Sequence, residues 1–118
     1  MISVFTPIHK YTPKILNETY QSLTKQTFKD FEWVILLNGD ALNYKEEFEK
    51  LNEDWIKIFT TSVTNNIGKL KSICCNVSKG DILVELDYDD FLTENTLQKI
   101  NDAFLNEEIN FVYSNTIR

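Results

Sequence analysis

Short runs of apolar residues alternate with helical patterns along the chain, and this alternation constrains the fold more than any other feature. Such alternation implies a mostly parallel sheet with helices packed on both of its faces. The chain has 118 residues, which is the size of one domain. We therefore predict a single domain over residues 1–118 with a three-layer α/β fold. Its predicted strands are residues 2–5, 31–37, 55–59, 82–86 and 111–113.

The segments between these strands each carry one apolar face at helical spacing. Thr12 and Thr93 are expected to be the N-caps of the first and last helices, and Gly80 the C-cap of the third. The first strand is expected to end at Thr6-Pro7. The four apolar faces are Leu16, Tyr20 and Leu23; Tyr44, Phe48 and Leu51; Leu70, Ile73, Cys74 and Val77; and Leu97, Ile100 and Phe104.

The charge of the chain narrows the range of its ligands. Acidic residues number 18 against 12 basic ones, for a net charge of -6, which argues against a nucleic-acid partner. The single arginine is Arg118, so an anionic ligand would depend on lysines, backbone amides or a metal ion. Cys74 and Cys75 are adjacent and lack a zinc-binding pattern, so we expect two reduced thiols in a cytoplasmic protein.

Polar residues cluster in the loops that follow the predicted strands, where parallel sheets place their ligand crevice. The densest cluster is Asp87-Tyr88-Asp89-Asp90, directly after the fourth strand. Three carboxylates in four positions repel one another unless a cation or solvent intervenes, and carboxylate oxygens suit Mg²⁺ or Mn²⁺. A solvated acidic turn that caps the next helix is the alternative, and the spacing alone leaves both open.

A further set of motifs occurs in order along the chain, in residues 2–7, 20–27, 31–39, 68–71 and 79–90. Together these segments resemble family 2 of the glycosyltransferases. The resemblance covers nearly the whole chain and implies the GT-A fold, in which a Rossmann-like half binds a nucleotide sugar. It also implies sugar transfer from a nucleotide-diphosphate donor, usually with inversion and with a divalent metal, Mg²⁺ or Mn²⁺.

The resemblance assigns roles to individual residues around the donor. Asp87 and Asp89 would form the DxD motif, with Asp87 near the ribose and both residues at the metal. Asp90 is expected to support the motif or to cap a helix. Lys71 falls where the family often has a basic residue facing the diphosphate, with Lys69 as the alternative.

The nucleoside pocket implied by the resemblance draws on the first two strand ends. Thr6, Pro7 and His9 lie in the first loop, where the His9 ring would stack on the base or remain exposed. Asn38, Gly39 and Asp40 follow the second strand, where many relatives carry an acidic residue that contacts uracil. Asn38 can still hydrogen-bond a base edge, and a UDP-sugar is the donor we favour.

Family members continue beyond the region that corresponds to residues 111–115 into an acceptor-binding half. We therefore expect this chain to be truncated, with the general base beyond Arg118, and to be inactive alone. The acceptor would be a saccharide or a lipid-linked molecule of cell-envelope polysaccharide biosynthesis, reached by a full-length protein peripheral to the membrane. An exposed sheet edge would suit a homodimer. The alternative is a non-catalytic α/β nucleotide-binding or interaction module.

Overall fold

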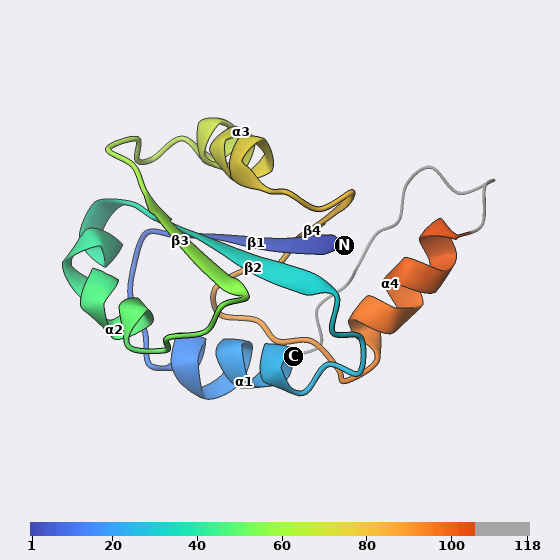
Figure 1. The fold of residues 1–118 in the computed structure, drawn as a ribbon. Coiled ribbons are helices and arrows are strands. Elements are labelled where there is room, and N and C mark those ends of the chain that lie inside the picture. The colour runs from blue at the N-terminus through green and yellow to red at the C-terminus, as the bar shows by residue number, and fades with distance from the viewer. Residues whose placement is uncertain (106–118) are drawn as a thin grey trace.

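A parallel sheet of four strands, in the order β3-β2-β1-β4, forms the centre of the molecule (Figure 1). The computed structural model describes residues 1–105. The predicted α/β class and parallel sheet are confirmed, whereas the predicted strand at 111–113 lies outside the described residues. The strands are β1 (Ile2–Ile8), β2 (Phe31–Leu37), β3 (Ile56–Thr60) and β4 (Ile82–Glu85).

Helices cover both faces of this sheet, which completes the three predicted layers. Helix α3 lies on one face, and α1 and α2 lie on the other (Figure 1). The buried residues of α4 belong to the same hydrophobic cluster as those of α1 and α2. The helical elements are η1 (Ile15–Thr19), α1 (Tyr20–Thr24), η2 (Gly39–Tyr44), α2 (Lys45–Glu49), α3 (Ile67–Val77) and α4 (Thr96–Phe104).

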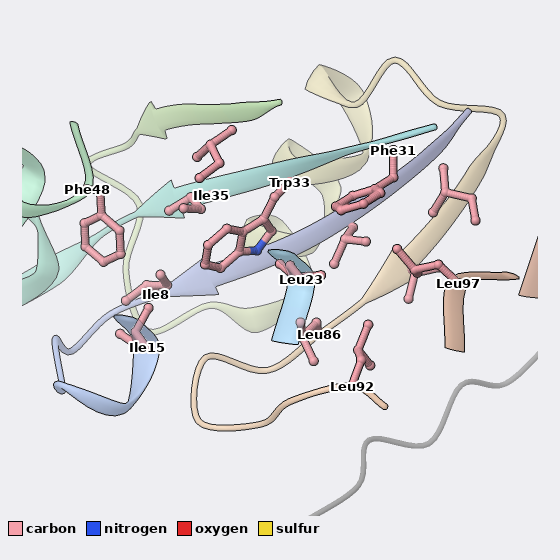
Figure 2. Packing of buried hydrophobic residues seen from close by; sticks show 14 of the residues in the cluster. Ile8, Ile15, Leu23, Phe31, Trp33, Ile35, Phe48, Leu86, Leu92 and Leu97 are labelled. Carbon is pink, nitrogen blue, oxygen red and sulfur yellow. The ribbon is translucent and has the colours of Figure 1, made fainter. Parts of the chain in front are cut away.

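Strand β2 runs through the middle of the core, and all seven of its residues are buried. Alternate side chains enter two hydrophobic clusters, as expected for a strand covered on both faces. Trp33 and Ile35 belong to the larger cluster beneath α1 and α2, which Figure 2 shows at close range. Val34 packs with Cys74 in the smaller cluster beneath α3, where burial raises the pKa of the Cys74 thiol to about 12.

Strand β1 is longer than predicted, because it continues through Thr6 and Pro7 to Ile8. Pairing with β4 ends at Phe5, whereas pairing with β2 continues to the last residue. Pro7 therefore lies beyond the last β1–β4 pair, where a missing backbone N–H costs the sheet no hydrogen bond. The prediction that Thr6-Pro7 ends the strand is wrong for this reason.

Two predicted helix caps are also wrong. The first helical turn begins after Lys14, and the Thr12 hydroxyl has no hydrogen-bond partner within the part of the chain that is described. The Thr93 hydroxyl lies 2.8 Å from the hydroxyl of Thr96 instead of capping a backbone N–H, and Asn95 is the N-cap of α4. Backbone contacts fix these two helix starts: the Ile15 N–H donates to the Thr12 carbonyl and the Thr96 N–H to the Thr93 carbonyl.

Gly80 does not cap α3, as the sequence suggested, but lets two backbone segments approach closely. Helix α3 ends at Val77, and its C-cap is Ser78, whose hydroxyl donates to the Cys74 carbonyl at 2.7 Å. The Gly80 N–H donates to Ser3 Oγ at 2.7 Å, at the amino end of β1. A Cβ at position 80 would lie 2.7 Å from the Met1 carbonyl oxygen and from the Ser3 nitrogen.

A buried carboxylate completes this junction between α3 and the sheet. Glu32 is only 4% exposed, and its Oε2 accepts hydrogen bonds from the Ser3 hydroxyl at 2.6 Å and the Lys79 N–H at 2.7 Å. The junction lies at the amino ends of the strands, opposite the edge where ligands bind in such sheets. Within residues 1–105, no helix combines the length and apolar character needed to cross a lipid bilayer.

Candidate functional site

Three aspartates converge at the carboxyl end of β4, in a segment (residues 87–90) that we call the acidic loop. One carboxylate oxygen from each of Asp87, Asp89 and Asp90 can be chosen so that all lie within 4.8 Å of one another. Asp87 and Asp89 are exposed, whereas Asp90 is buried. A hydrogen bond of 3.1 Å from the Asp90 N–H to the Asp87 carbonyl closes the loop. Their oxygens thus form a compact group of hard ligands of the kind that Mg²⁺ and Mn²⁺ prefer.

The electrostatics of the acidic loop fit a bound cation. Burial raises the pKa of the Asp87 carboxyl, and the negative charges of Glu85, Asp90 and Asp89 raise it further. Lys71 acts in the opposite direction and lowers that pKa. Concentrated negative charge of this kind is costly without a counterion, and a divalent cation would relieve it. The residues present therefore suit a divalent metal ion.

Lys71, which is predicted to face the diphosphate, lies at the border of the acidic loop and has a partner that the sequence did not reveal. Its Nζ forms an ion pair with Glu85 Oε1 at 3.0 Å, and both side chains are about two-fifths exposed. Glu85 ends β4 and Lys71 lies in α3, so this pair links the helix to the strand that carries the acidic loop. Lys69 is exposed in the first turn of α3, where its N–H is capped by Asn66 Oδ1 at 3.1 Å.

His9 reaches the acidic loop from the end of β1. Its ring contacts the ring of Tyr88 edge to face, with centroids 5.4 Å apart and an interplanar angle of 89°. His9 is exposed and Tyr88 is partly buried. The contact brings a residue from the predicted nucleoside pocket beside the predicted metal-binding residues, although they are almost eighty positions apart in the chain.

The Asn38 side chain is fully buried and engaged at both ends. Its Nδ2 donates to the Ile8 carbonyl at 3.1 Å, and its Oδ1 accepts from the Thr64 hydroxyl at 3.3 Å. Asn38 thus ties the carboxyl end of β1 to that of β2 and to the loop after β3. Gly39 follows with a φ of 56°, a left-handed conformation that favours glycine, and Asp40 is exposed beside it. Contacts of these residues with a base remain predictions.

Thr6 and Pro7 lie in β1, next to its carboxyl end at the site. The Thr6 side chain is fully buried, and its Oγ1 accepts a hydrogen bond of 2.8 Å from Trp33 Nε1. Pro7 is partly buried at the next position. The Thr6 hydroxyl therefore helps to hold the core under the site, and any contact of this segment with a nucleoside would come from its backbone or from Pro7.

Three buried polar residues, which we call the polar stripe, are not apparent as site residues from the sequence: Thr19 at the end of η1, Ser22 in α1, and Gln26 just after α1. These side chains bond to the backbone of the segment that follows β4, including the acidic loop. Their spacing of three and then four residues is the spacing of one helix face. That spacing was readable from the sequence, but only the fold shows which segment the stripe contacts.

Comparison with known proteins gives a family match over almost the whole chain. The model of the family described as Glycosyl transferase family 2 matches residues 3–118. The glycosyltransferase GlyG of Streptococcus pneumoniae is 23% identical over 117 residues, which cover 98% of this chain and 38% of that protein. The O-antigen biosynthesis protein RfbC of Myxococcus xanthus is 24% identical over 89% of this chain and 8% of its own length. The chain therefore spans well under half the length of these relatives.

Solved structures show the same fold. Residues 1–349 of TarS from S. aureus match with a TM-score of 0.73 and 23% identity, covering 90% of this chain and 32% of that one. A structure of the same TarS segment in complex with UDP matches with a TM-score of 0.72. GalNAc-T7, solved with UDP, GalNAc and Mn²⁺, matches with a TM-score of 0.67 and 25% identity, covering 80% of this chain and 19% of that one.

Proposed function

This chain belongs to glycosyl transferase family 2, and we propose that it forms the donor site of an enzyme that transfers a sugar from a nucleotide diphosphate. The observation that carries the proposal is the convergence of three carboxylates at the carboxyl end of β4, with a lysine at the border. In parallel α/β sheets this edge is where ligands bind. A solvated helix cap would not require three acidic side chains so close together.

Asp87 and Asp89 are the residues that would hold a divalent cation, with Asp90 as a supporting carboxylate. The side chains of Asp87 and Asp89 are exposed, so a ligand has access to them. The cation, Mg²⁺ or Mn²⁺, would neutralise negative charge on the diphosphate leaving group. The Mn²⁺ and UDP present in the GalNAc-T7 structure support this assignment.

Lys71 would supply the positive charge that a chain almost without arginine lacks at the donor. In the structure its Nζ pairs with Glu85, and both groups remain partly exposed. An arriving diphosphate would compete with Glu85 for this ammonium group. The pair therefore holds Lys71 beside the acidic loop before the donor binds.

The nucleoside would lie over the ends of β1 and β2, between His9 and Asp40. Both side chains are exposed at this edge of the sheet, and Gly39 leaves the backbone uncovered between them. UDP is the nucleotide we propose, supported by the UDP complexes of TarS and GalNAc-T7. A His9 ring stacked on the base would exchange its contact with Tyr88 for one with the ligand.

In the complete reaction, an acceptor oxygen would attack the anomeric carbon while the bond to the diphosphate breaks, with inversion at that carbon. The proton of the acceptor would pass to a general base of the enzyme. The acceptor would be a saccharide or lipid-linked molecule of the cell envelope. The relative named for O-antigen biosynthesis supports that class of acceptor.

Titration calorimetry with UDP and GDP, each with and without Mn²⁺, tests this proposal. We expect UDP to bind with measurable heat in the presence of Mn²⁺, to bind at least about tenfold more weakly without it, and to bind more tightly than GDP. A folded sample that binds neither nucleotide in the presence of Mn²⁺ would contradict the proposal. Binding that is indifferent to the metal would favour the non-catalytic module instead.

A further inference from the structure

We propose that Thr19 is a positioning residue, whose hydroxyl holds the backbone of the acidic loop so that the carboxylates of Asp87 and Asp89 converge. The inference rests on the proposed function, because it assumes that the acidic loop binds a divalent cation. Thr19 itself would not touch the metal or the donor. It would act through the backbone carbonyls of Tyr88 and Asp90, the residues on either side of Asp89.

The hydrogen bonds of Thr19 bracket the central aspartate. Its Oγ1 lies 3.1 Å from the Tyr88 carbonyl oxygen and 2.5 Å from the Asp90 carbonyl oxygen, so both carbonyls share the single hydroxyl proton. Thr19 is fully buried, and water therefore does not compete for these bonds. With the bond from the Asp90 N–H to the Asp87 carbonyl, the loop backbone is fixed on both sides of Asp89.

The rest of the polar stripe continues this attachment toward α4. Ser22 Oγ accepts from the Leu92 N–H at 3.2 Å and donates to the Thr19 carbonyl at 2.7 Å. Gln26 donates to the Thr93 carbonyl at 2.7 Å and accepts from the Leu97 N–H at 3.1 Å. The segment between β4 and α4 therefore runs along α1, as Figure 1 shows, and is attached by side chains of η1, of α1 and of Gln26 just after α1.

Hydrophobic packing holds both ends of the acidic loop and the Tyr88 side chain in its middle, whereas Thr19 holds the Tyr88 and Asp90 carbonyls. Leu86 precedes the loop and Leu92 follows it, and both are buried in the larger cluster with Leu23 of α1 (Figure 2). Between these anchors, the Thr19 hydroxyl is the group that ties the Tyr88 and Asp90 carbonyls to the helix. Its loss should leave the ends in place and loosen the aspartates between them.

The test compares two substitutions of Thr19 with a matched threonine on the same helix. Thr19→Val keeps the shape and removes the hydroxyl, whereas Thr19→Ser keeps the hydroxyl. Thr24→Val is the control, because Thr24 is a half-buried threonine of α1 whose hydroxyl donates to the nearby Gln21 carbonyl at 2.7 Å, away from the acidic loop. Binding of Mn²⁺ alone is measured from its electron paramagnetic resonance signal, at a temperature where circular dichroism shows each variant folded.

We expect Thr19→Val to weaken Mn²⁺ binding about tenfold, as is typical of residues that orient metal ligands, and Thr19→Ser and Thr24→Val to stay within about twofold of the wild type. A purely structural role would lower the melting temperature of Thr19→Val without changing the Mn²⁺ affinity of the folded protein. That result would overturn the positioning role while leaving the metal site intact. A wild-type chain that binds no Mn²⁺ would overturn the metal site itself.

Ser22→Ala covers the case in which Thr19→Val does not fold. This substitution removes the hydroxyl that accepts from the Leu92 N–H, two residues after the acidic loop, and it adds no atoms to the core. We then expect Mn²⁺ binding several-fold weaker than that of the wild type, at the low end of the range for such residues. Unchanged Mn²⁺ affinity in folded Ser22→Ala would count against positioning of the loop by the polar stripe.

Discussion

Replacing Asp89 with asparagine is expected to reduce metal-dependent UDP binding by roughly a hundredfold or more, beyond the typical effect of residues that only orient ligands. The amide keeps the size of the side chain but removes the negative charge that a divalent cation requires. The substitution also removes one of the charges that raise the pKa of Asp87. The free protein should therefore be as stable as the wild type or slightly more so. Calorimetry with UDP and Mn²⁺, beside thermal unfolding, measures both effects.

Asp54→Asn is the matched control for this substitution. Asp54 is an exposed aspartate in the loop before β3, at the opposite end of the sheet from the acidic loop. Asp54→Asn changes the net charge by the same amount as Asp89→Asn, so a general electrostatic effect on nucleotide binding would appear in both variants. If Asp89 served only as a helix cap, Asp89→Asn would bind UDP normally and lose at most about 1 kcal/mol of stability.

The substitution Gly80→Ala should strongly lower the stability of the folded chain. Gly80→Ala is expected to lower the free energy of unfolding by about 3 kcal/mol or more, because overpacking and a lost buried hydrogen bond add together. The new Cβ would lie 2.7 Å from backbone atoms of Met1 and Ser3, which cannot rotate away as a side chain would. Separation of these segments would also break the bond from the Gly80 N–H to Ser3 Oγ. The melting temperature should fall by about 10 °C.

Gly68→Ala provides the comparison, since this glycine lies inside α3 with open space around it. The nearest atom to its added Cβ would be Asn66 Oδ1, at 3.7 Å, which is an ordinary contact. Alanine in a helix is more stable than glycine, so we expect a gain of about 0.5 kcal/mol. A Gly80→Ala protein as stable as the wild type would show that the two segments can separate at no cost.

Much of the architecture could be predicted from the sequence, because strongly apolar strands and amphipathic helices leave periodic signals. Strand β2 was predicted with its bounds, since residues 31–37 are apolar enough for a strand buried on both faces and Asn38-Gly39 ends it. Strand β1 was predicted too short because Pro7 usually ends a strand. The sequence does not show that β4 stops pairing two residues earlier, which is what makes a proline acceptable there.

The role of Gly80 illustrates a different limit. A glycine after a helix usually indicates a left-handed cap, and this local pattern predicts a C-cap at Gly80. The actual reason is a contact with Met1 and Ser3, almost eighty residues earlier in the chain. Close approach between distant segments leaves no local pattern, so a sequence reading assigns the residue to the commoner role.

The candidate site was predictable as a set of loops but not as a set of contacts. Parallel topology places the ends of β1, β2 and β4 at one edge, which brings His9 beside Tyr88. The partners of Lys71 and Asn38 were not predictable, because an ion pair with Glu85 and a buried amide depend on how helix and strand pack. Buried polar groups must find partners, but the sequence does not identify them.

Paramagnetic broadening by Mn²⁺ tests most directly whether the acidic loop is the donor's metal site. In a nitrogen-15 labelled chain with UDP, added Mn²⁺ should first broaden the amide signals of residues 87–90 and then that of His9 across the Tyr88 contact. Amides near Glu46, Glu47 and Glu49 of α2, a helix whose acidic side chains are exposed or partly exposed, should persist. Broadening that begins at α2, or that affects all acidic segments equally, would contradict a metal-dependent donor site at the end of β4.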